Sequence, residues 1–114
     1  MAGRIEAKLA ELGITLPTPM APVANYVPYV VTGDLVVISG QLPMADGKLV
    51  AVGKITEGVT AEQATAGARH CFINLLAQLK VACGGDLDRV RQVVRLGGFI
   101  AAPSSFTQHA AVMK

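Results

Sequence analysis

The chain has 114 residues, of which 52% are apolar and 16% charged, and its ten basic and eight acidic residues give a net charge of +2. This length favours a single domain over residues 1–114, and charges this few and scattered argue against nucleic acid as a partner. A monomer so rich in apolar residues has too few polar groups to cover its surface, so we expect subunits that cover one another.

Two classes of protein are disfavoured by the absence of their signals. No apolar run approaches the roughly 20 residues of a membrane-spanning helix, so we expect a soluble protein with no membrane partner. Residues 1–8 alternate in charge and lack the apolar core of a signal peptide, which predicts a cytoplasmic location. Cys71 and Cys83 have no Cys or His at metal-ligand spacing, so both are predicted to be reduced core residues, with no metal site or disulfide.

The first elements along the chain are a short helix, a connector and a hairpin. Residues 4–12 carry apolar side chains at helical spacing and precede Gly13, which predicts an N-terminal helix. The connector at 16–22 contains three prolines and is predicted to be extended. Residues 26–32 and 35–39 are rich in β-branched and aromatic side chains and flank a Gly-Asp pair, which predicts two antiparallel strands joined by a tight turn.

A short strand is predicted over 49–52, and a long amphipathic helix follows it. Thr60 and Gln63 match a capping box at the start of this helix, and Gly84 with Gly85 supplies its left-handed end. Its apolar stripe is predicted to be the buried face that anchors the core and consists of Ala64, Ala68, Cys71, Phe72, Leu75, Leu79 and Ala82.

The last elements are a strand and a helix. The valine-rich pattern of residues 89–101 predicts a long strand bent at Gly97 and Gly98, and residues 106–114 are predicted to begin a helix. The order β-β-β-α-β-α predicts an α+β fold with the long helix across one face of a sheet. Such an ending leaves a sheet edge and a helix face uncovered, so we expect the closing C-terminal strands to be missing from a shortened form of a longer protein. The alternative is that the short chain is the natural product.

The most informative residues lie at the end of the second predicted strand, at Ser39 and Gly40. A buried hydroxyl beside a glycine, whose bare backbone lets another molecule approach closely, is one way to hold an oxygen of a small polar compound. An ordinary strand that ends in a turn remains the alternative at this point.

These residues begin a pattern that resembles a known family. Residues 39–43, Ser-Gly-Gln-Leu-Pro, resemble the Ser-Gly-Gln-hydrophobic-Pro signature of the RidA/YjgF family, which is also called endoribonuclease L-PSP-like. The flanking segment 33–43, the Asn-Leu-Leu-Ala-Gln-Leu stretch at 74–79 and the link at 84–88 match as well, so the resemblance covers about residues 23–106. The N-terminal helix and connector indicate a longer, less characterised branch.

The resemblance implies a chorismate-mutase-like fold, assembled as a homotrimer with clefts between subunits. It also implies cofactor-free hydrolysis of reactive enamines and imines, such as 2-aminoacrylate, to a 2-keto acid and ammonia, which is an imine deaminase activity. The residues carried over to the substrate-binding wall are Tyr26, Ser39 and Gly40. For Tyr26, packing of a strand aromatic against its neighbour is the alternative.

The chain departs from the family pattern at the catalytic positions. Relatives that deaminate imines grip the substrate carboxylate with an arginine and position water with an acidic residue, both in a segment beyond Lys114. Ala110 stands where the family has a cleft asparagine, and the arginines at 69, 91 and 95 do not match the missing one.

No catalytic residue is therefore assigned. We expect a protein that binds enamine, imine or keto-acid metabolites with weak or no deaminase activity. The alternative is a non-catalytic metabolite-binding or regulatory protein.

Overall fold

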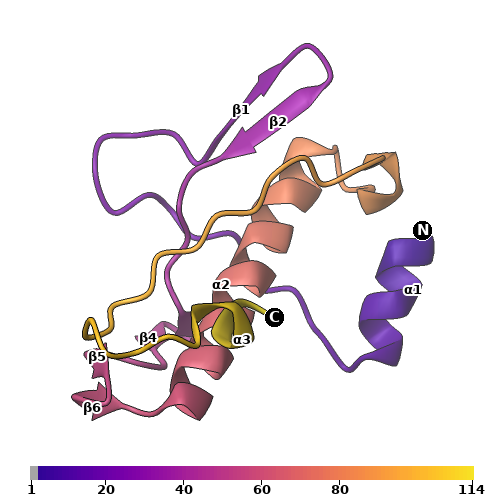
Figure 1. Cartoon of the computed structure of the whole chain (residues 1–114). Coiled ribbons are helices and arrows are strands. Elements are labelled where there is room, and N and C mark those ends of the chain that lie inside the picture. The colour runs from indigo at the N-terminus through magenta and orange to yellow at the C-terminus, as the bar shows by residue number, and fades with distance from the viewer. Residues whose placement is uncertain (1–2) are drawn as a thin grey trace. The chain divides into compact units, whose positions relative to one another are not determined.

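Figure 1 shows a computed structural model of the chain, which describes residues 3–114. Residues 1 and 2, part of the segment interpreted above as lacking a signal peptide, lie outside it. The described residues divide into two compact units. The first unit comprises residues 3–40 together with Ile73–Val94, and the second comprises Gln41–Phe72 together with Arg95–Lys114. The mixture of one long helix with small sheets confirms the α+β class.

In the first unit, a β-hairpin follows the N-terminal helix and connector. Strands β1 (Tyr29–Thr32) and β2 (Leu35–Ile38) pair antiparallel, and Gly33 adopts a left-handed φ of 57° in the turn, as the sequence predicts. The first strand begins three residues later than predicted. The side chains on one hairpin face are all exposed and belong to Val30, Thr32, Leu35 and Val37.

The core of the first unit lies around the second half of the long helix. Helix α1 (Arg4–Glu11) buries Leu9 and contacts the 3₁₀ helix η1 (Leu87–Arg89), whose Leu87 is 1% exposed. Helix α2 (Ala61–Ala82) begins at the predicted capping box, where the Thr60 N–H donates to Gln63 Oε1 and the Gln63 N–H donates to Thr60 Oγ1.

The second unit contains four very short strands and the last helix. Strands β3 (Met44–Ala45) and β4 (Lys48–Leu49) pair antiparallel, and β5 (Lys54–Ile55) and β6 (Gly58–Val59) pair in parallel. The described strands thus form three two-stranded sheets instead of one continuous sheet. Helix α3 (His109–Met113) is shorter than predicted, and the buried apolar side chains of this unit are Ile55, Val59 and Val112.

The prediction for the buried face of α2 was wrong. None of the seven residues of the apolar stripe is fully buried, and Phe72 is 42% exposed. The fully buried positions of α2 are Gly67, Asn74, Ala77 and Gln78. Gln78 can be buried because its Nε2 donates to the carbonyl oxygen of Met20 in the connector at 2.9 Å, which replaces the lost contact with water.

The long strand predicted over 89–101 was also wrong. Arg89 ends η1, and the residues that follow are extended without a strand ladder. Residues 91–99 are all exposed, and the Phe99 side chain is as accessible to water as it would be in an unfolded, extended chain. A strand requires a neighbouring strand with which it exchanges backbone hydrogen bonds. In this segment, the carbonyl of Ala101 accepts such a bond from the Ile55 N–H, but no ladder of bonds forms along residues 91–99.

Candidate functional site

Ser39 follows directly after β2 and is half-buried. Its backbone N–H and its hydroxyl both donate to the carbonyl oxygen of Pro28, each at 3.0 Å. Pro28 has no N–H and therefore cannot donate a backbone hydrogen bond back to Ser39. The Ser39 hydroxyl supplies the second hydrogen bond between the two residues instead. Ser39 thereby fixes the open end of the hairpin.

Gly40, the next residue, is exposed. Its φ is not in the left-handed region, and a Cβ built on it would meet no atom within 4 Å among the described residues beyond its two chain neighbours. Neither the local turn nor packing within the described chain therefore requires a glycine here.

Tyr26 lies in the bend before β1 and is 43% exposed. Its phenolic oxygen accepts a hydrogen bond from the Val23 N–H at 3.4 Å. Because Tyr26 is two residues before Pro28, and Pro28 binds Ser39, Tyr26 and Ser39 flank the same end of the hairpin. The binding role of Tyr26, Ser39 and Gly40 stays a prediction.

The described residues supply few other groups for catalysis. Burial raises the pKa of the Cys71 thiol, which keeps it protonated and a poor nucleophile at neutral pH. Both cysteines are free, in line with the prediction that they are not paired. Within residues 3–114, no group of three or more His, Cys, Asp or Glu side chains is arranged to hold a metal ion.

The comparisons with known proteins agree on one family. Residues 6–114 match the family described as "YjgF/chorismate mutase-like, putative endoribonuclease". The chain is 40% identical over 111 residues to Protein TCP17 of Trypanosoma cruzi, covering 97% of this chain and 69% of that protein. It belongs to the YjgF/chorismate-mutase-like family.

Two crystal structures resemble the fold of this family member closely. The first is a protein of unknown function from Agrobacterium tumefaciens, which is 42% identical to this chain with a TM-score of 0.85. The match covers 96% of this chain and 66% of the Agrobacterium protein. An endoribonuclease, so named provisionally, from Shewanella oneidensis is 35% identical with a TM-score of 0.89, covering 95% of this chain and 71% of its own. The chain thus spans about two thirds of the length of these YjgF relatives.

The other positions singled out from the sequence all lie on the surface. Ala110, predicted to stand where the family has a cleft asparagine, is exposed in α3. The three unmatched arginines, Arg69, Arg91 and Arg95, are also exposed.

A pocket in the second unit was not anticipated from the sequence. It has a volume of about 440 Å³ at the start of α2 and is lined by Ile55, Thr56, Gly58, Val59, Thr60, Ala61 and Phe106. Thr56 has a left-handed φ of 69°, unusual for a β-branched residue. The lining contains no acid or base, so this pocket offers no group for proton transfer. The only sequence signal for it is the turn-prone segment between Gly53 and Gly58.

No helix within residues 3–114 combines the length and the apolar character required to cross a bilayer.

Proposed function

We propose that the chain binds a small carboxylate-bearing enamine, imine or 2-keto acid beside Tyr26, Ser39 and Gly40, in a cleft that a neighbouring copy completes. The observation that carries this proposal is the environment of Gly40. It is an exposed glycine with open space around it and no backbone requirement for glycine. A ligand that approaches the backbone closely would require a glycine at position 40, because any larger residue would place a side chain between the ligand and the backbone.

The polar groups at this strand end suggest how the ligand would be held. The hydrogen of the Ser39 hydroxyl points to Pro28, so Ser39 chiefly fixes the backbone from which Gly40 extends. The Gly40 N–H would then donate to an oxygen of the ligand, and the exposed ring of Tyr26 would cover one side of it. This arrangement suits a compact, planar acid of three or four carbons.

For an imine ligand, the chemistry proposed is hydrolysis. The oxygen of water forms a bond to the imine carbon while one of its protons moves to the nitrogen, which gives a carbinolamine. The proton of the new hydroxyl then moves to the nitrogen, the C=O bond forms, and the C–N bond breaks to release ammonia and the 2-keto acid. No redox cofactor is required for this balance. The arginine and the carboxylic acid of deaminating relatives lie outside residues 1–114, so we expect these 114 residues, assayed by themselves, to bind the ligand and turn it over slowly.

The exposed apolar surface supports association of subunits. Val30, Leu35 and Val37 lie on one exposed face of the hairpin, and exposing such a face to water is unfavourable. We propose a homotrimer, for which light scattering should give three times the 11.8 kDa of one chain. A monomeric mass would remove the proposed intersubunit cleft.

Thermal shift with pyruvate and 2-ketobutyrate tests the binding site. We expect the melting temperature of the wild type to rise with either acid, and Gly40→Ala to reduce that rise. Gly97→Ala is the matched control, because Gly97 is also exposed and also lies outside the left-handed region. An equal response of both variants would contradict the role of Gly40.

Turnover separates the deaminase from the alternative of a non-catalytic metabolite-binding protein. Release of pyruvate and ammonia from enzymatically generated 2-aminoacrylate should be much slower with this chain than with a longer YjgF relative. Equal acceleration would show that the missing arginine and acid are dispensable. A melting shift without turnover would favour the non-catalytic protein.

A further inference from the structure

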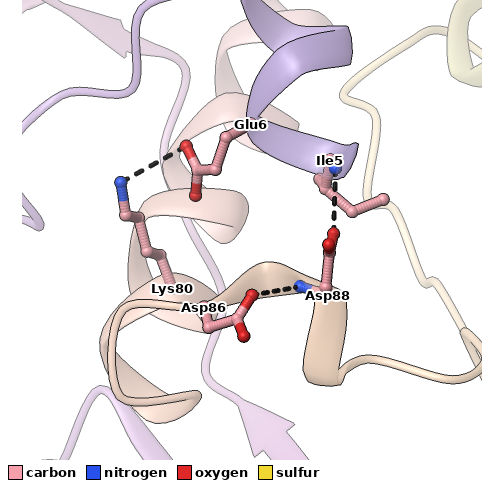
Figure 2. A network of polar contacts seen from close by, with 5 residues as sticks. All are labelled: Ile5, Glu6, Lys80, Asp86 and Asp88. Atoms are coloured by element: carbon pink, nitrogen blue, oxygen red, sulfur yellow. Dashed lines mark hydrogen bonds and ion pairs between the residues drawn. The ribbon is translucent and has the colours of Figure 1, made fainter. Parts of the chain in front are cut away.

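The N-terminal end of α1 is capped by a residue far away in the sequence. The first N–H groups of a helix have no partner within the helix, and Gly3, at the N-cap position, has no side chain to supply one. Instead, Asp88 Oδ2 accepts from the Arg4 N–H at 2.8 Å and Asp88 Oδ1 accepts from the Ile5 N–H at 2.9 Å. Figure 2 shows the carboxylate of Asp88 directed at the start of α1. A negative charge at this position also suits the helix dipole.

The position of Asp88 is itself fixed by a second cap. Asp86 is the N-cap of η1, and its Oδ1 accepts from the Asp88 N–H at 3.0 Å. Gly3 completes the fit, because a Cβ at that position would overlap the carboxylate of Asp88. The two caps therefore connect η1 to α1, with the glycine allowing the close approach.

Further polar contacts join α1 to the rest of the first unit. Lys80 Nζ lies 3.3 Å from Glu6 Oε2 and links α1 to the end of α2 (Figure 2). Leu9 is the buried side chain of α1, whereas Ile5 is 39% and Leu12 is 55% exposed. Besides one buried leucine, capping and charged groups thus hold this helix in place.

We propose that α1 is a releasable strap that Asp88 clasps to η1, and that it undocks as a unit while the remainder of the first unit stays folded. An isolated helix of eight residues is not stable in water, so undocking and unwinding of α1 are one event. The proline-containing connector at 16–22 keeps the released strap tethered, and release removes the contact between α1 and η1.

Hydrogen exchange on the full-length chain tests this strap. In Asp88→Ala, we expect the amides of α1 to exchange roughly fivefold faster or more, with no change in the amides of residues 64–82. Asp34→Ala is the matched control, because it makes the same substitution in the exposed hairpin turn of the same unit. Unchanged exchange in α1 would show that Asp88 is not the clasp.

Limited digestion with trypsin gives an independent readout, because Lys8 lies inside α1 and is cleaved only when the helix opens. Cleavage after Lys8, followed by mass spectrometry, should be faster in Asp88→Ala than in Asp34→Ala. If α1 and α2 lose exchange protection together in Asp88→Ala, α1 is an integral part of the folded unit and the strap is refuted.

Discussion

Gly3 and Gly40 lie in the same unit and are both glycines outside the left-handed region, yet their surroundings differ completely. Gly3 is required by the chain itself, since a Cβ would overlap Asp88. At Gly40, the described residues other than its two chain neighbours place no atom within 4 Å of where a Cβ would lie. One glycine allows an internal docking contact, whereas the other leaves a strand end open to something outside the described chain. The two positions therefore separate a structural glycine from a candidate ligand-binding one.

The largest expected effect concerns η1, the 3₁₀ helix that carries Asp88 and so positions it against Gly3. Leu87 is 1% exposed in η1, next to Asp88, so Leu87→Ala should lower the free energy of unfolding by about 2–5 kcal/mol and displace the clasp. Leu35→Ala is the control, because Leu35 is 42% exposed and its truncation should cost far less. Urea titration measures both; equal losses would mean that η1 is not a supporting element.

A smaller effect is expected from the glycines themselves. Gly3→Ala should force the Asp88 carboxylate away from the Arg4 and Ile5 N–H groups and accelerate cleavage by trypsin after Lys8. Gly40→Ala should leave both this cleavage and the urea midpoint unchanged, because the added methyl group meets open space. If Gly40→Ala destabilised the chain as much as Gly3→Ala, the distinction between the two glycines would fail.

The smallest effect is a dependence of α1 on pH. The N–H groups of Ile5 and then Arg4, with a further contribution from the Arg4 charge, hold the pKa of Asp88 below its ordinary value of 3.8. A carboxyl with a lowered pKa in the folded state stabilises that state above its unfolded pKa, and the contribution is lost as the pH falls through the folded value. Docking of α1 should thus be constant from pH 8 to about 5 and weaken below about 4.

NMR amide exchange of Ile5 would measure this pH dependence. The neighbouring charged groups are Arg4 and Glu6 on α1, Lys80 on α2 and Asp86 before η1, so Asp88→Asn is needed to isolate one carboxyl. The variant should lack the part of the decline due to Asp88. Identical pH profiles for the variant and the wild type would assign the decline to the other acids.

Local rules were enough to predict several elements. The capping box at Thr60 and Gln63 and the left-handed φ of 68° and 94° at Gly84 and Gly85 appear where the sequence predicts them. Each involves atoms within a few residues of one another, so neighbouring side chains and backbone preferences decide them. The family signature was equally local, because residues 39–43 are contiguous.

The failures involve partners that are distant in sequence. The apolar pattern of 89–101 is that of a strand, but no ladder forms along it in the described chain. The most buried face of α2 contains Asn74 and Gln78, which the apolar pattern placed outside, since Gln78 meets a carbonyl 58 residues away. The spacing of apolar residues along the sequence shows which side chains could be buried together, but it does not show which distant segments pack against them.

The sequence by itself determined the start and the end of the long helix α2, the hairpin turn, the α+β class and the family, because these depend on short-range geometry and on a contiguous motif. Only the tertiary structure decided that Asp88 caps a helix 83 residues before it and that Gly3 and Gly40 serve opposite purposes. The physical reason is that a capping bond and the space around a missing Cβ depend on where distant backbone segments meet, and no local preference specifies that meeting.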